Sequence, residues 1–400
     1  MKEWKLKECC LSISDGDHLP PPKSNAGIPF ITISNIDSTN HLDFKNTLFV
    51  PIEYYDKLDS IRKAQIGDII YSVVGSFGKP VLIKDNKKFA FQRHIAILRP
   101  NSSIVDSRYL YYVMLTREFY MQADSVAIGA AQRTISLTSL RNMKVKLPSL
   151  DFQQRIATIL SRYDSLIENY QKQIKLLEES AQRLYKEWFI DLRFPGHENT
   201  KIVDGVPEGW EKKKIGDISK TTSGGTPSRT NNSFYSGSIM WVKTKELCDG
   251  FILGTEEKIT EEAIKKSSAK IVPAGSILMA MYGATIGKLG IATKDLTCNQ
   301  ACCVFLISED NPLRWYIFNW LLQNRNFLIS QGKGAAQPNL SQDMIKGFEL
   351  IIPDDKSLRG YHLLINPIYL NIKSLQSQIC QLTEARNRLL PKLMNGEIEI

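Results

Sequence analysis

The feature that most constrains this chain is a long apolar seam between residues 151 and 190. Apolar side chains recur there in steps that alternate between four and three residues, without any Pro or Gly. So narrow a heptad stripe is typical of a coiled-coil helix, and at about 1.5 Å per residue it spans about 48 Å. The seam residues are Ile156, Leu160, Tyr163, Ile167, Tyr170, Ile174, Leu177, Ala181, Leu184 and Trp188.

A helix with so narrow a stripe needs a partner, and the C-terminal region supplies one. A second seam runs from Ile365 to Leu393, with Arg386 in one slot. The two helices predict an α+β fold in which an antiparallel coiled coil separates two β-rich domains. The other residues of the second seam are Ile368, Ile372, Leu375, Ile379, Leu382 and Leu389.

The second half of the chain repeats the first. Ile174 and Leu184 recur as Ile379 and Leu389 at one constant offset. A constant offset over more than fifty residues indicates a tandem duplication of a β-rich domain followed by a long helix. Residues 129–132 recur as residues 334–337 at the same offset of 205, and Gly67, Gly75 and Gln92 recur 208 residues later as Gly275, Gly283 and Gln300.

The repeat predicts five segments. They are a first β-rich domain (1–147), a central helix (148–191), a linker (192–207), a second β-rich domain (208–353) and a C-terminal helix (354–400). Within the first domain, β-branched runs bounded by turn residues predict strands, and a periodic run predicts a helix. The strands are expected at 29–33, 66–74, 81–83 and 94–98, and the helix at 108–121.

Charge and cysteine content restrict the class of protein. The net charge is +9, and the excess of Lys and Arg lies in the two globular blocks, which is typical of a surface that meets a polyanion such as nucleic acid. The seven Cys residues form no metal or disulfide pattern. The charged N-terminus lacks a signal peptide, and no apolar run reaches the roughly 20 residues of a membrane span. We expect a cytoplasmic protein.

Two short motifs imitate catalytic ones. Residues 366–369 (Asn-Pro-Ile-Tyr) resemble a motif of methyltransferases that act on base amino groups, but the second Pro is missing and no glycine-rich cofactor loop accompanies them. Residues 283–288 are one residue short of a phosphate-binding loop, and Leu289 replaces its magnesium-binding hydroxyl. No arrangement of nucleophile, base or metal ligands stands out, so we expect no catalytic residues, no metal and no cofactor.

The whole chain resembles the specificity subunit of type I restriction–modification systems. The resemblance rests on the twofold repeat and on the motifs at 147–160 (Leu-Pro-Ser-Leu-Asp-Phe-Gln-Gln-Arg-Ile-Ala-Thr-Ile-Leu), 184–189, 206–210, 215–217, 222–227, 340–341 and 388–397. The family commonly has Glu-Gln where this chain has Gln153 and Gln154. The resemblance implies a non-catalytic subunit whose two domains each read half of a bipartite double-stranded DNA target. It also implies that two methyltransferase subunits and the restriction subunits carry the activities.

Candidate DNA contacts are polar residues of the glycine-rich turns and strand ends, because such side chains bind base edges and phosphates. A role as solvated loop residues is equally open for each of them. In the first domain they are Ser34, Asn35, Ser76, Lys79, Arg93 and Arg133, and in the second Lys243, Lys245, Thr285, Lys288, Gln337 and Asn339.

Two other functions remain open from the residues alone. One is a single-chain methyltransferase or endonuclease with an unrecognised active site, which would modify or cut DNA without added subunits. The other is a coiled-coil adaptor, which would not be retained on duplex DNA at low salt.

Overall fold

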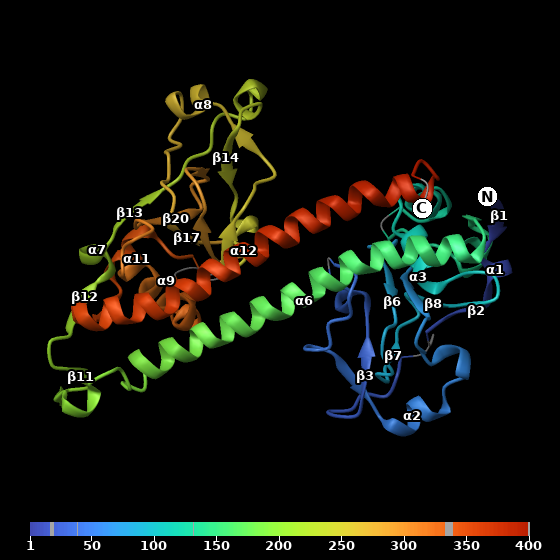
Figure 1. Cartoon of the computed structure of the whole chain (residues 1–400), viewed down its shortest axis with the longest axis horizontal. Coiled ribbons are helices and arrows are strands. Elements are labelled where there is room, and N and C mark those ends of the chain that lie inside the picture. The colour runs from blue at the N-terminus through green and yellow to red at the C-terminus, as the bar shows by residue number, and fades with distance from the viewer. Residues whose placement is uncertain (17–19, 38, 131, 333–338, 399–400) are drawn as a thin grey trace. The chain divides into compact units, whose positions relative to one another are not determined.

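The computed structural model describes residues 1–400 except 17–19, 38, 131, 333–338 and 399–400. The chain divides into two compact units (Figure 1). The first unit combines Met1–Ile167 with Leu382–Ile400, and the second is Glu168–Gln381. Each unit therefore contains a globular part and segments of both long helices, α6 (Leu150–Phe189) and α12 (Asp355–Met394).

The first unit is built on two small sheets and a two-stranded ribbon. Their strand orders are β2-β8-β5-β6, β4-β3-β7 and β1-β9. The strands are β1 (Lys2–Lys5), β2 (Cys10–Asp15), β3 (Ile28–Ile31), β4 (Leu48–Val50), β5 (Ile69–Ser72), β6 (Pro80–Leu82), β7 (Ala90–Phe91), β8 (Ile95–Pro100) and β9 (Lys144–Leu147). The helices are α1 (Leu6–Cys9), α2 (Ile52–Lys57), α3 (Ser107–Met114), α4 (Arg117–Val126) and α5 (Leu137–Asn142), with 3₁₀ turns η1 (Ile33–Asn35) and η2 (Ser60–Arg62).

The second unit has the same plan. Its sheet orders are β13-β20-β17-β18-β15, β16-β14-β19, β12-β21 and the hairpin β10-β11. The strands are β10 (Ile202–Val203), β11 (Val206–Pro207), β12 (Glu211–Lys214), β13 (Lys220–Ser223), β14 (Ile239–Val242), β15 (Gly250–Ile252), β16 (Lys258–Ile259), β17 (Ile277–Ala280), β18 (Leu289–Ala292), β19 (Thr297–Cys298), β20 (Cys302–Leu306) and β21 (Glu349–Ile352). The helices are α7 (Ile215–Ile218), α8 (Glu261–Lys265), α9 (Leu313–Gln323), α10 (Arg325–Ser330) and α11 (Gln342–Gly347), with 3₁₀ turns η3 (His197–Asn199), η4 (Asn232–Tyr235) and η5 (Thr244–Glu246).

Strand pairing confirms the tandem repeat. In the first unit β3 pairs with β4 antiparallel and with β7 parallel, and in the second β14 pairs with β16 antiparallel and with β19 parallel. Likewise β5 lies between β6 and β8, and β17 between β18 and β20. Strand β15, which pairs parallel with β18, has no counterpart among the strands described for the first unit.

The two long helices bury their predicted seams within the units. In the first unit the start of α6 packs against the end of α12, through residues such as Ile156, Leu160 and Leu393. In the second unit the end of α6 packs against the start of α12, where the rings of Tyr185 and Tyr361 lie 6.4 Å apart. The helices therefore run antiparallel in each unit. All the predicted seam residues are buried or half-buried, including Tyr163, Ile167, Tyr170, Ile174, Leu177, Ala181, Leu184, Trp188, Ile365, Ile368, Ile372, Leu375, Ile379, Leu382 and Leu389.

Several predicted boundaries were wrong for local reasons. The helix expected at 108–121 is two helices, because α3 ends at Met114 and a new helix, α4, begins after Thr116. The Thr116 hydroxyl caps α4 by accepting from the Phe119 backbone N–H (3.2 Å). The strand expected at 29–33 ends at Ile31 and passes into η1. The segment predicted as a linker contains the hairpin β10-β11. Over the described ranges, no helix has the length and hydropathy needed to cross a bilayer.

Candidate nucleic-acid interface

The two glycine-rich turns predicted from the sequence occupy equivalent places, directly after the central strands β5 and β17. Gly75 and Gly78 have φ of 66° and 92°, and Gly283 and Gly287 have φ of 84° and 77°, a region that favours glycine. The first turn is closed by the Ser72 hydroxyl, which accepts from the Lys79 N–H (2.9 Å) and donates to the Ser76 carbonyl (3.0 Å). The turns thus present short, fixed loops at one end of each sheet.

The first unit has two basic candidates that are not neutralised. Arg93 is exposed in the turn between β7 and β8, and Lys79 is half-buried at the end of the glycine turn. Neither side chain forms an ion pair with any described residue. Because phosphate contacts require an accessible cation, these two residues are the best placed of the predicted set in this unit.

Arg133 is engaged inside the first unit instead. Its guanidinium donates to the Asp124 carboxylate and to the Ala127 carbonyl (3.4 Å), and lies 5.4 Å from the centre of the Phe77 ring. The backbone carbonyl of Arg133 also accepts from the Gly75 N–H (2.9 Å). These contacts favour a role for Arg133 in holding the glycine turn.

The basic candidates of the second unit are paired with carboxylates. The Lys243 ammonium lies 2.8 Å from both Glu256 and Glu257, and Lys245 lies 2.5 Å from Glu256. Hydrogen bonds from Lys243 and Lys245 lower the pKa of the Glu256 carboxyl to about 2. Lys288 lies 2.7 Å from Asp249. A phosphate therefore meets a less positive surface here than at Lys79 and Arg93.

The candidates Asn35 and Lys243 belong to equivalent 3₁₀ turns, η1 and η5, and the sequence comparison did not predict this equivalence. In η1 the Asn35 side-chain oxygen accepts from the Thr32 backbone N–H (2.9 Å), and in η5 the Glu246 carboxylate accepts from the Lys243 backbone N–H (2.7 Å). Asn35 is buried, and its amide also donates to the Asp43 carbonyl (3.2 Å). Its hydrogen bonds are used within the turn, which favours a structural role.

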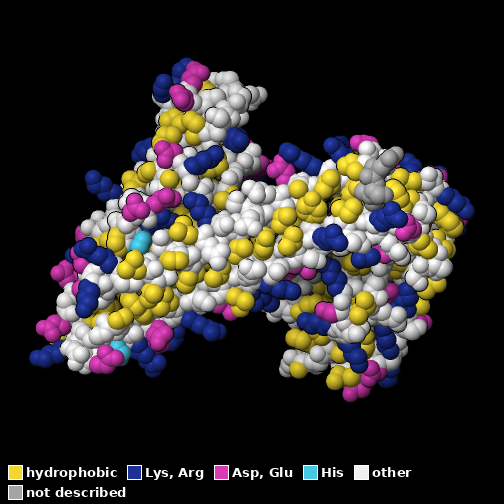
Figure 2. Space-filling view, viewed as in Figure 1, with side chains coloured by type: hydrophobic (Ala, Val, Ile, Leu, Met, Phe, Trp, Pro, Cys, Tyr) yellow, Lys and Arg dark blue, Asp and Glu magenta, His cyan; other side chains and the backbone are white. Residues whose placement is uncertain are grey.

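The remaining predicted candidates are small polar groups. Ser34 and Ser76 are exposed in the first unit, while Thr285 is half-buried and Asn339 exposed in the second. Gln337 lies outside the described residues. Figure 2 shows Lys and Arg side chains scattered among Asp and Glu over the visible face rather than gathered in one patch.

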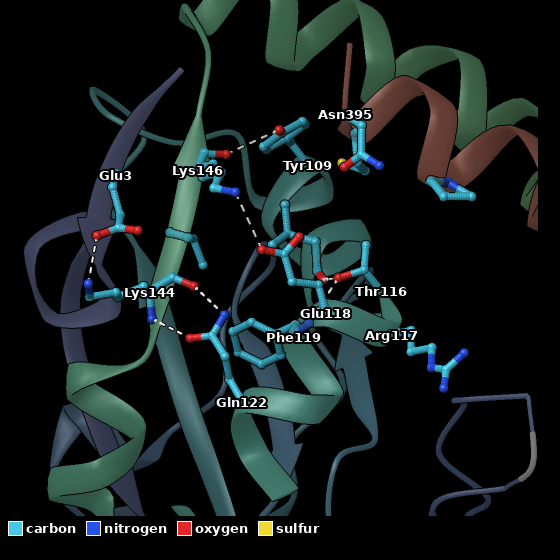
Figure 3. A pocket seen from close by; sticks show the side chains of 14 residues that line it. Glu3, Tyr109, Thr116, Arg117, Glu118, Phe119, Gln122, Lys144, Lys146 and Asn395 are labelled. Carbon is cyan, nitrogen blue, oxygen red and sulfur yellow. Dashed lines mark hydrogen bonds and ion pairs between the residues drawn. The ribbon is translucent and has the colours of Figure 1, made fainter. Parts of the chain in front are cut away.

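A hollow of about 530 Å³ in the first unit was not predicted (Figure 3). Its walls come from α3, α4, β9 and the end of α12. The Gln122 amide donates to the Lys144 carbonyl (3.1 Å) and its oxygen accepts from the Lys144 N–H (3.0 Å), as a paired strand would. Lys144 and Lys146 form ion pairs with Glu3 and Glu118, and Arg117 lies apart from these pairs. The lining contains no His or Cys.

A further surface lies on α12, opposite its buried seam. Leu363 is 74% exposed, Leu364 53% and Leu370 50%. On a helix, positions 363, 367 and 370 share one face, and residue 367 is an exposed proline. Leu363 and Leu370 therefore lie on one exposed face of α12. Among the described residues, no group of His, Cys, Asp and Glu side chains could hold a metal ion.

Comparisons with known proteins agree with this arrangement. A family model described as "Type I restriction modification DNA specificity domain" matches residues 2–179 and again residues 207–357. The chain is 31% identical over 307 residues to the MjaIX specificity subunit of Methanocaldococcus jannaschii, covering 75% of this chain and 71% of that protein. It is 24% identical over 441 residues to the HindI specificity subunit of Haemophilus influenzae, covering 92% and 95%. A solved S subunit from M. genitalium has the same fold, with a TM-score of 0.61, 14% identity and coverage of 98% and 95%.

Proposed function

Because the chain belongs to the type I restriction–modification DNA specificity family, we propose that it selects the DNA sequence on which a type I complex acts. Each unit reads one half of a bipartite duplex target. The observation that carries this proposal is the family match to both repeats, on two units with the same strand pairing. Paired readers that face two half-sites are a general solution to recognising duplex DNA.

Base readout is assigned to the turns at the sheet ends, with Lys79 and Arg93 binding phosphates in the first unit. Both side chains are free of carboxylate partners in the described part of the chain. Phosphate contacts position a protein on DNA, while contacts with base edges give the sequence preference. Lys79 and Arg93 therefore supply affinity, and the small polar residues of the turns supply discrimination.

Methyl transfer and cleavage belong to partner subunits, namely methyltransferase and restriction subunits, in the cytoplasm. The exposed leucines of α12 (Leu363, Leu364 and Leu370) supply an apolar surface suited to a partner helix. Two methyltransferase subunits fit a chain whose domain-plus-helix repeat occurs twice. The chain itself acts as recognition subunit and scaffold.

The test is methylation mapping in cells that carry this chain with its cognate methyltransferase subunit. We expect a single bipartite motif with two defined half-sites and a fixed spacer. The purified chain is assayed in parallel on duplex DNA for methylation and cleavage without added subunits. Activity of the purified chain alone would establish the single-chain enzyme instead, and failure to bind duplex DNA at low salt would establish an adaptor.

A further inference from the structure

Asp249 occupies an unusual backbone position in the second unit. It has a φ of 64°, in the left-handed region that few residues other than glycine adopt, and it directly precedes β15. Its backbone N–H donates to the Leu289 carbonyl (2.8 Å), and its carboxylate accepts from the Leu289 N–H (3.0 Å). Asp249 is therefore fastened to the first residue of β18, where the glycine turn of this unit ends.

The Asp249 carboxylate also joins two cations. It accepts from the Lys288 ammonium (2.7 Å) and from both terminal nitrogens of the Arg325 guanidinium, one of them at 3.1 Å. The remaining guanidinium N–H of Arg325 donates to the Gly287 carbonyl (2.9 Å). One carboxylate thus ties the glycine turn to helix α10 and fixes the Lys288 side chain.

These three side chains differ in exposure. The side chains of Asp249 and Arg325 are 21% and 22% exposed, while that of Lys288 is 44% exposed. Lys288 is therefore the member that a ligand meets. Its charge is offset by a carboxylate at 2.7 Å, so the field that it presents to an approaching anion is reduced.

A second acid faces this group from α6. Glu178 lines a hollow of about 300 Å³ together with Asp249 and Arg325. Burial raises the pKa of Glu178, and the nearby charge of Asp249 raises it further. The environment thus disfavours a second negative charge, and Asp249 is the carboxylate that the two cations share.

The first unit offers no equivalent of this arrangement in its described residues. Asp249 is placed by β15, and the sheet order β2-β8-β5-β6 contains no strand in that position. Lys79, the counterpart of Lys288, has no ion pair with a described residue. The two turns are therefore similar in backbone and different in charge.

We propose that Asp249 is a positioning residue for DNA recognition by the second unit, which fixes Lys288 on the turn and weakens sequence-independent attraction to phosphates. This inference rests on the proposed function, because it requires that the turn faces DNA. Asp249 thus improves discrimination between target and non-target DNA and lowers the overall affinity for DNA. The loss of a residue that only supported the fold would weaken binding to target and non-target DNA alike.

The variant Asp249→Asn tests the inference, in the full chain purified with its methyltransferase subunits. Binding is measured against salt for duplexes carrying the mapped target, for duplexes with either half scrambled, and for non-target DNA. We expect non-target DNA to bind about fivefold more tightly at low salt, with a salt slope steeper by about one unit, because a cation is released for a further phosphate. Discrimination should fall at one half-site only.

The matched control is Asp343→Asn, which removes another carboxylate of the second unit, one that is 93% exposed and 3.3 Å from Lys346. It should leave discrimination unchanged. The double variant Asp249→Asn/Lys288→Gln should lose the gain in non-target binding. Equal weakening of target and non-target binding, or no difference from the Asp343→Asn control, would overturn the inference.

If Asp249→Asn does not fold, Lys288→Gln carries the test. The Lys288 ammonium is already paired with Asp249. Lys288→Gln should therefore reduce the salt slope by clearly less than Lys79→Gln does. Equal reductions would contradict the proposal. A wild-type complex without any sequence preference would instead refute the proposed function, so the two failures are distinguishable.

Discussion

The hydroxyl of Tyr112 in α3 donates a hydrogen bond to the carboxylate of Asp164 in α6 over 2.6 Å. Asp164 also accepts from Arg386 of α12 (2.6 Å), so one carboxylate joins the globular part of the first unit to both long helices. Tyr112 is 2% exposed. Burial and the neighbouring charge of Asp164 both raise the pKa of the Tyr112 hydroxyl, which therefore stays protonated as the donor.

The second unit has the same bond with donor and acceptor exchanged. There Tyr369 of α12 donates to the side-chain oxygen of Asn319 in α9 over 2.8 Å. Tyr369 lies 205 residues after Asp164, which is the offset of the two long helices. Asn319 lies 207 residues after Tyr112, as Tyr316 of α9 lies after Tyr109 of α3. The repeat thus preserves a link between domain helix and long helix, while the residue types at both ends have changed.

This link gives the first prediction. Tyr112→Phe should lower the free energy of unfolding of the first unit by about 2 kcal/mol, because a buried bond to a charged acceptor is lost. Asp164→Ala should cost about 3 kcal/mol or more, since it leaves both Tyr112 and Arg386 without their acceptor. Denaturant unfolding of the full chain measures both. Arg388→Ala is the control. It breaks an exposed ion pair with Glu384 and should cost about 0.5 kcal/mol.

A second prediction concerns acid. Burial of Asp354 favours its protonated form, but hydrogen bonds from Ser357 and Trp210 outweigh this and hold the pKa of Asp354 below its usual 3.8. A lowered folded-state pKa contributes stability above the unfolded-state pKa, and that stability disappears as pH falls through the folded-state value. Wild type should therefore exceed Asp354→Asn in thermal stability near pH 6 and lose this advantage below about pH 4.

The control for this pH series is the neighbouring residue. Asp355 is 86% exposed, and its ion pair among the described residues is with Arg359, which is itself 70% exposed. Asp355→Asn should therefore show little pH-dependent difference from wild type. An advantage over Asp354→Asn that persisted unchanged at pH 3 would mean that the Asp354 charge contributes nothing.

The third prediction concerns phosphate contacts in the first unit. Lys79→Gln and Arg93→Gln should each weaken binding about equally for all DNA sequences and lower the salt slope by about one unit. Binding titrations of the full complex over a range of salt concentrations measure this. Lys144→Gln, in which the replaced lysine is paired with Glu3 on the β1-β9 ribbon, serves as control. A slope that matches wild type would remove the tested residue from the interface.

The fourth prediction concerns independence of the units. Replacing residues 1–147 by the first domain of another family member should change one half of the methylated motif only. The donor must accommodate Gln153 of α6, whose amide donates to the Ile104 carbonyl (3.2 Å) and whose oxygen accepts from the Asp106 N–H (3.0 Å). Methylation mapping gives the result, and a motif altered in both halves would argue against independent reading.

The fifth prediction tests the partner surface on α12. Leu363→Glu and Leu370→Glu should reduce co-purification of the methyltransferase subunit at least tenfold, because a charge would be buried at the contact. Thermal stability should change little, since both leucines are at least half exposed. Leu11→Glu, at a leucine that is 68% exposed in the first unit, is the matched control. Undiminished co-purification would exclude this face.

The sequence was most informative where a periodic pattern decides the structure. Heptad spacing located α6 and α12, and glycine spacing located the turns with positive φ, because both depend on residue type at fixed intervals. The sequence did not predict equivalent positions at which different residue types make the same hydrogen bond. Asn35 and Glu246 cap equivalent turns with an amide and a carboxylate oxygen, so no identity marks them. The ion pairs of Asp249 with Lys288 and Arg325 could not be predicted, because these residues come from three segments that only folding brings together.

Both ends of the chain belong to the first unit, since Leu382–Ile400 is part of it together with Met1. A methyl group added at Gly396 would lie 3.6 Å from the Met1 side chain. A short peptide could therefore join the old termini, with new ends opened at about residue 200 in the segment after α6. Because the repeat is a domain followed by a helix, such a circular permutant keeps that order and exchanges only which copy is translated first. We expect the permutant to select the same DNA sequence as the wild type. DNA recognition would then not depend on which of the two copies comes first in the chain.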